Sequence, residues 1–375
     1  RNTRNTMETP WIPAKSQIVY QAQSDENVAQ PCIVRMLDGN LIILVQQKGN
    51  EPIFIRSTDG GRTWSQPYSG ILPDGAGEIS TLGVGHNGRL ITVLGHASEN
   101  LRTSVVKKRT VMSSGGREYL TYEGYRYNGS LRLAYSSNQG ETWTMGNAVD
   151  FSPMVAAWTW VGGRILELGN GTLIIPVAGY LSEQDMDGIW LSTGVALSKD
   201  DGITWDLSVI GRGSSNDWII FSEPAVAKLG GDMLVALMRT EDRVTKQNSA
   251  DPQSNRHGLH QARSSDGGKT WSSPIKTLEG THCSLTPLLD GTLLCGCHRP
   301  PRLALSADGG ESWYANMLWS TEAPMENWGW YTSVEVVDTN TAVAVIKQYP
   351  AKNIIRICYL HQQGTYLGKE GDNVK

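Results

Sequence analysis

Residues 57–64 read STDGGRTW, and four further octamers follow the same pattern, S-x-x-x-G-x-[TS]-W: SSNQGETW at 136–143, SKDDGITW at 198–205, SSDGGKTW at 264–271 and SADGGESW at 306–313. The glycine permits the positive φ of a tight turn, and the Asp or Asn before it can accept hydrogen bonds from the backbone of the turn. The tryptophan offers a large apolar surface to a neighbouring unit. Five copies of one octamer predict an internally repeated fold.

A second repeat interleaves with the octamers. It consists of an apolar run, a turn that usually carries Asp-Gly, Asn-Gly or Gly-Gly, and another apolar run, which is the pattern of a β-hairpin. Six copies occur, at 33–45, 82–95, 165–179, 225–239, 285–299 and 334–347. Because no stretch keeps a helical period, the chain is predicted to be all-β.

Together the two repeats predict a six-bladed β-propeller with four-stranded antiparallel blades. Each blade would combine an inner hairpin, a third strand, an octamer turn and a fourth strand, and the chain from 1 to 375 would form one domain. We expect the blades near 30–70, 76–150, 156–212, 222–278, 282–320 and 329–361. The sixth hairpin has no octamer after it, so residues 17–23 (QIVYQAQ) are expected to supply its missing strand and close the ring.

Composition excludes several classes of protein. The net charge is −4, from 33 Lys and Arg against 37 Asp and Glu, so the chain lacks the basic field of a nucleic-acid binder. The apolar runs, such as 41–45, are far shorter than the ~20 residues of a transmembrane helix. An anionic ligand would therefore have to be attracted by a local cluster of Arg or Lys.

The cysteines and the first residues of the chain support two further expectations. Five cysteines, an odd number without a C-x-x-C pair, predict buried reduced thiols rather than a disulfide framework or a zinc ribbon: Cys32, Cys283, Cys295, Cys297 and Cys358. The chain opens at Arg1 without an apolar signal region, so any targeting segment is expected to be absent or already removed.

The octamers are similar to Asp-boxes, and residues 16–361 resemble the sialidase-like six-bladed β-propellers. The resemblance implies a glycoside hydrolase that acts on a terminal, acidic sugar of a glycan without a cofactor or metal, and it alone implies a secreted or periplasmic location. Exo-sialidases grip the substrate carboxylate with three arginines, attack with a tyrosine activated by a glutamate, and use an aspartate as acid/base. Guanidinium groups suit this task because they hold a carboxylate by paired hydrogen bonds.

Three segments match the catalytic part of this pattern. Glu223, in Ser222-Glu223-Pro224, and Arg239, sixteen residues later, resemble the family's glutamate and second arginine at one end of a single hairpin. Tyr331, in the segment WGWY, resembles the nucleophile, since an unperturbed tyrosine needs a neighbouring base to attack an anomeric carbon. The third arginine is matched by Arg302, with Arg299 as its competitor.

Two family positions are altered. The first strand should open with an aromatic-Arg-Ile-Pro motif, but residues 28–31 read VAQP, which puts Ala29 where the first arginine would stand. The acid/base aspartate is also missing from residues 46–51 (QQKGNE), where Glu51 is the only carboxylate and a candidate for the replacement acid. Losing one arm of a carboxylate clamp and the acid/base would weaken binding and slow the chemistry, so the substrate or the mechanism differs from that of an ordinary sialidase.

Other residues at comparable strand ends are candidates to replace them. Glu78 and the three histidines could provide acid/base chemistry near neutral pH, and the aromatic residues could stack on a sugar ring. The spacing of the histidines does not match a metal site. These candidates are Glu78, His96, Trp158, Trp160, Arg164, Tyr180, His282, His298, Trp328 and Trp330. Insertions at 102–127 and 240–259 are expected to shape the pocket wall.

Two alternatives to the hydrolase remain open. A polysaccharide lyase acting on a uronate would use Arg to neutralise the carboxylate and His or Tyr to move the proton. A non-catalytic glycan-binding propeller would use the tryptophans as stacking platforms. The two altered family positions favour this alternative, while the retained Glu223, Arg239 and Tyr331 argue against it. The sugar, its linkage, the anomeric outcome and the oligomeric state do not follow from the sequence.

Overall fold

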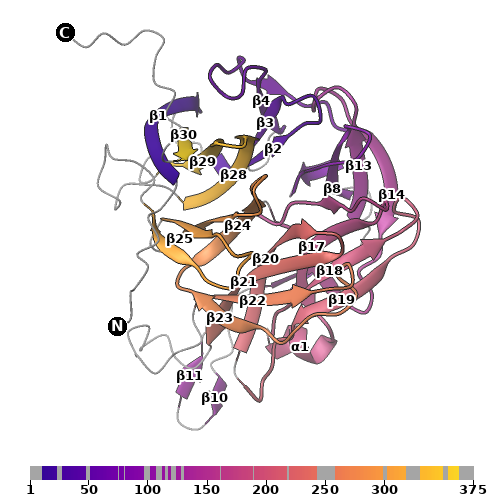
Figure 1. The fold of residues 1–375 in the computed structure, drawn as a ribbon. Coiled ribbons are helices and arrows are strands. Elements are labelled where there is room, and N and C mark those ends of the chain that lie inside the picture. The colour runs from indigo at the N-terminus through magenta and orange to yellow at the C-terminus, as the bar shows by residue number, and fades with distance from the viewer. Residues whose placement is uncertain are drawn as a thin grey trace, which may run out of the picture.

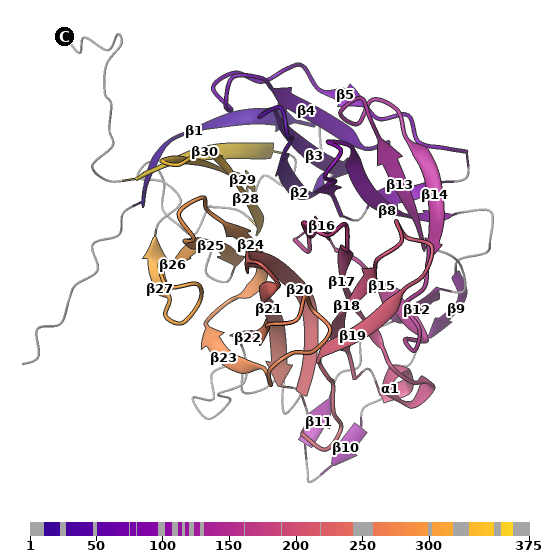
Figure 2. The ribbon, with the colours of Figure 1, turned by 45° about the vertical axis from the view of Figure 1, so that its right-hand side comes forward.

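The computed structural model shows a ring of six β-sheets, each of which runs outward from a common centre (Figure 1; Figure 2). It describes residues 11–22, 28–47, 51–74, 76–79, 81–96, 102–106, 112–114, 117–119, 124–127, 131–160, 162–188, 190–217, 219–242, 258–298, 302–317, 330–348 and 354–362. The all-β class, the six blades and their four antiparallel strands are therefore confirmed.

The strands of the first three blades follow chain order from the centre outward. Blade one contains β2 (Val28–Arg35), β3 (Leu41–Gln47), β4 (Ile53–Ser57) and β5 (Tyr68–Ser69). Blade two contains β6 (Ala76–Ile79), β7 (Gly83–Val84), β8 (Leu90–His96), β13 (Leu131–Ser136) and β14 (Thr144–Val149). Blade three contains β15 (Ala156–Trp158), β16 (Leu166–Glu167), β17 (Leu173–Tyr180), β18 (Ser192–Ser198) and β19 (Asp206–Gly211). In blades two and three the inner strand is interrupted, so two short strands pair with one neighbour.

The other three blades have uninterrupted inner strands. Blade four contains β20 (Ile219–Gly230), β21 (Met233–Asp242), β22 (Gly258–Ser264) and β23 (Ile275–Leu278). Blade five contains β24 (Thr281–Pro287), β25 (Leu293–His298), β26 (Arg302–Ser306) and β27 (Tyr314–Met317). Blade six contains β28 (Trp330–Asp338), β29 (Thr341–Lys347) and β30 (Ile354–Gln362), and β1 (Trp11–Gln21) is its outer strand. The N-terminal segment thus closes the ring as predicted, with a strand that begins earlier than residue 17.

The core is divided into one apolar cluster for each blade interface. Ile33 and Ile43 of blade one, for example, pack with Val343 and Val345 of blade six. Every octamer tryptophan lies in or against one of these clusters, which confirms the expected packing between units: Trp64, Trp143, Trp205, Trp271 and Trp313. Because each blade is covered on both faces, its strands read as nearly continuous apolar runs.

The octamer turns and the inner-hairpin turns lie on the same face of the ring, which we call the lower face. The register shows this, since Ser57 at the end of β4 pairs with Leu41 at the start of β3. In the first octamer Ser57 Oγ accepts the Gly61 N–H at 2.7 Å and donates to Asp59 Oδ1 at 2.8 Å. The Asp59 carboxylate also accepts the N–H and the hydroxyl of Thr63. The opposite face, where the inner strands begin, is the upper face.

A few elements lie outside the blades. One short helix, α1 (Glu183–Gly188), follows β17, where no helix was predicted. The insertion after β8 forms two strand pairs, β9 (Arg102–Val106) with β12 (Gly124–Tyr127) and β10 (Met112–Ser114) with β11 (Arg117–Tyr119). All five cysteines are buried and free, as predicted. Among the helices in the described part of the chain, none has the length and apolarity that crossing a membrane requires.

Candidate active site

Five of the six inner strands share one irregularity where they begin on the upper face. In blade four the register shifts between Ser222, which pairs with Arg239, and Ala225, which pairs with Leu237. Comparable shifts occur near the start of the inner strand in blades one, two, five and six. The residues that these bulges place out of register include Glu78, Glu223, His282 and Tyr331. A bulge redirects side chains, so four predicted site residues occupy related positions around the ring.

Glu223, Arg239 and His282 meet at the boundary between blades four and five. The Arg239 Nη1 group donates to Glu223 Oε1 at 3.4 Å and lies 3.3 Å from His282 Nε2. The same imidazole nitrogen is 2.9 Å from Glu223 Oε1. Arg239 Nη2 donates to Glu241 on the same strand. The hairpin therefore brings Glu223 and Arg239 together, as their positions at one end of it predict.

Backbone strain accompanies this arrangement. Glu223 and His282 have φ values of 51° and 50°, in the left-handed region that non-glycine residues rarely adopt. Such conformations persist only where the surroundings enforce them, and they concentrate at functional sites. Two strained residues at corresponding bulges of adjacent blades direct a carboxylate and an imidazole toward the same guanidinium.

In this cluster the guanidinium of Arg239 stays charged, and it lies beside the carboxylate of Glu223, which has one oxygen without a hydrogen-bond donor among the described residues. Burial by itself lowers the pKa of Arg239, but the carboxylates of Glu223 and Glu241 outweigh it and raise that pKa. Burial, with the nearby Glu223 charge, raises the pKa of the Cys283 thiol, which keeps this sulfur protonated. Among the described residues, nothing donates a hydrogen bond to Glu223 Oε2, although this oxygen is buried.

Aromatic residues of blade three adjoin this cluster. Trp160 Nε1 donates to the carbonyl oxygen of Pro224 at 2.8 Å, and the ring centroids of Trp160 and His282 are 6.5 Å apart. Trp158 packs edge-on against Tyr180 with ring centroids 5.8 Å apart, and Tyr180 is buried. Trp160 thus fixes the strained segment of blade four, while Trp158 and Tyr180 form part of an apolar support.

Arg164 lies deeper in the centre of the ring. Its guanidinium pairs with Glu335 of blade six at 2.5 Å, and it also donates to the Thr286 hydroxyl of blade five. Both charged side chains are close to nine-tenths buried. The ion pair therefore joins opposite sides of the ring across its axis, and the protein's own acceptors occupy this arginine.

The remaining predicted site residues are only partly covered by the structure. Glu51 is exposed in the connection between β3 and β4, on the upper face. Arg299 and Trp328 lie outside the described residues. Six others lie in strands, but their side chains lie outside the described part: Glu78, His96, His298, Arg302, Trp330 and Tyr331. Among the described residues, no three His, Cys, Asp or Glu side chains are placed to hold a metal ion.

Two residues of the upper face were not predicted. Glu241 follows Arg239 by two positions, so strand alternation already places both side chains on one face. Lys347 is the last residue of the apolar run AVAVIK and pairs with Trp330, as Arg239 pairs with Ser222 in blade four. Aligning the ends of the hairpin repeats, rather than seeking arginines alone, would have found Lys347.

Comparison with known proteins agrees with this architecture. A family model described as a BNR repeat-like domain matches residues 121–313, just over half of the chain. A sialidase of Paraclostridium sordellii is 25% identical over 231 residues, which span 55% of this chain and 51% of that protein. The chain therefore matches about half the length of this curated relative.

Two solved structures show the same fold. A protein of unknown function from Dyadobacter fermentans has a TM-score of 0.68 at 18% identity, over 94% of this chain and 100% of its own. An α-L-arabinofuranosidase of Fusarium graminearum has a TM-score of 0.64 at 12% identity, over 93% of this chain and 98% of its own. At such identities the likeness concerns the fold, which carries different activities in different proteins.

Proposed function

The chain belongs to the BNR repeat-like family, and on that premise we propose that it is a sialidase-like glycoside hydrolase that releases a terminal acidic sugar from a glycan on its upper face. The observation that carries the proposal is the largely buried cluster of Arg239 with Glu223 and His282, which lie in two strained bulges. A sialidase relative and an arabinofuranosidase with the same fold support glycoside hydrolysis in general. That the released sugar is acidic is the more specific part of this proposal.

In this mechanism Tyr331 attacks the anomeric carbon and Glu223 is its base. A buried carboxylate oxygen without a donor among the described residues is a favourable acceptor for a tyrosine hydroxyl, because an unpaired buried charge is destabilising. Tyr331 is the second residue of the inner strand of blade six, two blades from Glu223 around the ring. A covalent intermediate on Tyr331 would lead to retention of the anomeric configuration.

Recognition of the sugar carboxylate is assigned to Arg239 and Arg302. Arg239 is held in place by two carboxylates and by the imidazole of His282, so little conformational freedom is lost when a ligand binds. Arg302 begins the third strand of blade five, at the same face of the ring. Glu51, Glu78 and His96 are the candidates for the acid that protonates the leaving group.

The test is a panel of sialosides and uronic-acid glycosides, followed by release of the terminal sugar. Tyr331→Phe should abolish turnover, because phenylalanine has no oxygen to form the intermediate. Tyr314→Phe in an outer strand is the matched control and should retain activity. Full activity in Tyr331→Phe would remove the nucleophile assignment, and binding of an acidic glycan without any release would indicate a non-catalytic propeller instead.

The position of His282 favours one further candidate, a lyase that acts on a uronate. Its imidazole lies beside both Arg239 and Glu223, so a base stands next to a cation that could neutralise the substrate carboxylate. A lyase would form an unsaturated sugar with new absorbance in the near ultraviolet, and a hydrolase would not. The same incubation therefore separates the two reactions.

A further inference from the structure

We propose that Lys347 supplies a cation in place of the family's first arginine, and so forms one arm of the clamp for the substrate carboxylate. The family's first arginine would stand at Ala29, whose methyl group carries no charge. This inference rests on the proposed function, since it assumes an acidic sugar at the upper face.

The register of the strands places Lys347 where blade four has Arg239. Arg239 pairs with Ser222, directly before the bulge that contains Glu223. Lys347 pairs with Trp330, directly before the register shift at Tyr331. Each cation is therefore carried by the second strand of its blade and lies beside the start of a bulged inner strand. The proposed base and the proposed nucleophile occupy these two bulges.

Both cations also face the next blade around the ring. In β21, Val235 and Leu237 pack toward blade five, and Arg239 continues this alternation to contact His282 of that blade. In β29, Val343 and Val345 pack against Ile33 and other residues of blade one. Lys347 continues the second alternation, so it is directed toward blade one as Arg239 is directed toward blade five.

Burial makes the charge of Lys347 effective. The residue is only 9% exposed, and lysine is rarely buried to this extent unless its ammonium group is paired. An ammonium group screened from water interacts more strongly with an anion than one on an open surface. In this proposal a lysine of the neighbouring blade offers a point charge in place of the guanidinium fork of the family's first arginine.

The test compares an acidic sugar with its uncharged methyl ester, using N-acetylneuraminic acid or D-glucuronic acid in isothermal titration calorimetry. Wild-type protein should prefer the acid. Lys347→Met should weaken binding of the acid about 10- to 100-fold, the loss expected for one charged hydrogen bond, and leave the ester nearly unchanged. Lys347→Arg should keep the preference within about threefold, because it keeps the charge. Lys228→Met, in the lower half of β20, is the matched control.

The outcomes separate this inference from the proposed function. If Arg239→Met loses the preference for the acid while Lys347→Met retains it, Lys347 has no part in recognition and the proposed function stands. If folded wild-type protein binds acid and ester equally, or neither, both proposals fail. Should Lys347→Met not fold, Lys347→Gln decides, because retention of the preference in a folded protein without this charge would contradict the proposed role.

Discussion

The upper and lower faces of the propeller use charged side chains in opposite ways. On the lower face, hydrogen bonds from Thr63 hold the pKa of Asp59 at about 2, and the same arrangement gives Asp200 and Asp266 pKa values of about 2. On the upper face, Glu223 has a strained backbone and a buried oxygen without a donor among the described residues. Fully satisfied charges favour the fold, whereas strained and incompletely paired ones are typical of ligand sites.

Substitution of Glu223, whose backbone is strained, tests this contrast most strongly. Glu223→Gln removes the base but keeps the volume of the side chain and an acceptor for Arg239. If the sugar is released as proposed, the rate should fall by about 10²- to 10⁴-fold, the contribution expected of a general base. The melting temperature should change little, because Arg239 keeps its contacts with Glu241 and His282.

The matched control for Glu223→Gln is a glutamate of the lower face. Glu311 lies in the octamer turn of blade five with an exposed side chain, so Glu311→Gln should alter neither the rate nor the melting temperature. If Glu223→Gln kept activity within a few-fold of wild type, the cluster on the upper face would be structural and the contrast between the faces would fail.

Breaking the ion pair of Arg164 and Glu335, which lies between the two faces, should lower the free energy of unfolding most. Arg164→Met leaves Glu335 buried without its cation, and breaking a buried pair in this way costs about 3–5 kcal/mol of the free energy of unfolding. Adding Glu335→Gln should recover much of this loss, because the uncompensated charge is then gone. Urea unfolding measures both variants, and equal stability of Arg164→Met and wild type would show that the pair does not hold the ring together.

A substitution in an octamer turn of the lower face should lower the free energy of unfolding less than Arg164→Met does. In Ser264→Ala the buried N–H of Gly268 loses its acceptor at 2.9 Å, and Asp266 loses a donor. An unsatisfied buried group of this kind costs about 1–3 kcal/mol. The rate of sugar release under conditions where the protein is folded should not change. A variant that lost activity in proportion to stability would show that the two faces are coupled.

Most of the fold could be predicted from the sequence because its signals are local and repeated. The turn of each octamer is set by its own Ser, Asp or Asn, and Gly, so five copies identify five blades. The pairing of Glu223 with Arg239 was also predictable, since one hairpin joins them. The partner of Arg164 was not, because Glu335 is 171 residues away and meets it only when the ring closes. Lys347 was missed because a search for arginines overlooks a different cation at the same register.

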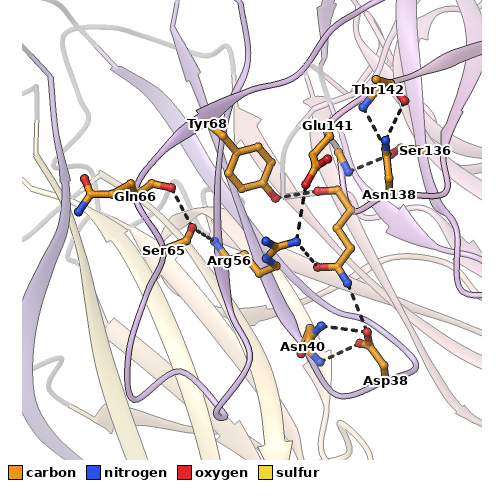
Figure 3. A network of polar contacts seen from close by, with 12 residues as sticks. Asp38, Asn40, Arg56, Ser65, Gln66, Tyr68, Ser136, Asn138, Glu141 and Thr142 are labelled. Carbon is orange, nitrogen blue, oxygen red and sulfur yellow. Dashed lines mark hydrogen bonds and ion pairs between the residues drawn. The ribbon is translucent and has the colours of Figure 1, made fainter.

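One octamer departs from the others and permits the finest comparison. In blade two Asn138 replaces the aspartate between Ser136 and Thr142 (Figure 3). Here Asn138 Nδ2 donates to Thr142 Oγ1 at 2.9 Å, whereas Thr63 Oγ1 donates to Asp59 Oδ2 at 2.6 Å. The hydrogen bond thus runs in the opposite direction, and the side chain at this position of the turn cannot titrate.

Asn138→Asp should therefore add one acid-sensitive turn. A carboxyl whose folded pKa of about 2 lies below its unfolded value of ~3.9 stabilises the protein above about pH 4, and this contribution is lost as the pH falls toward 2. Relative to wild type, the variant should be more stable at pH 6 than at pH 2, by no more than about 0.5 kcal/mol because the position is exposed. Urea unfolding at the two pH values, with both proteins measured together, checks the sign. A difference independent of pH would mean that the introduced carboxylate does not receive the hydrogen bonds that Asp59 receives from Thr63.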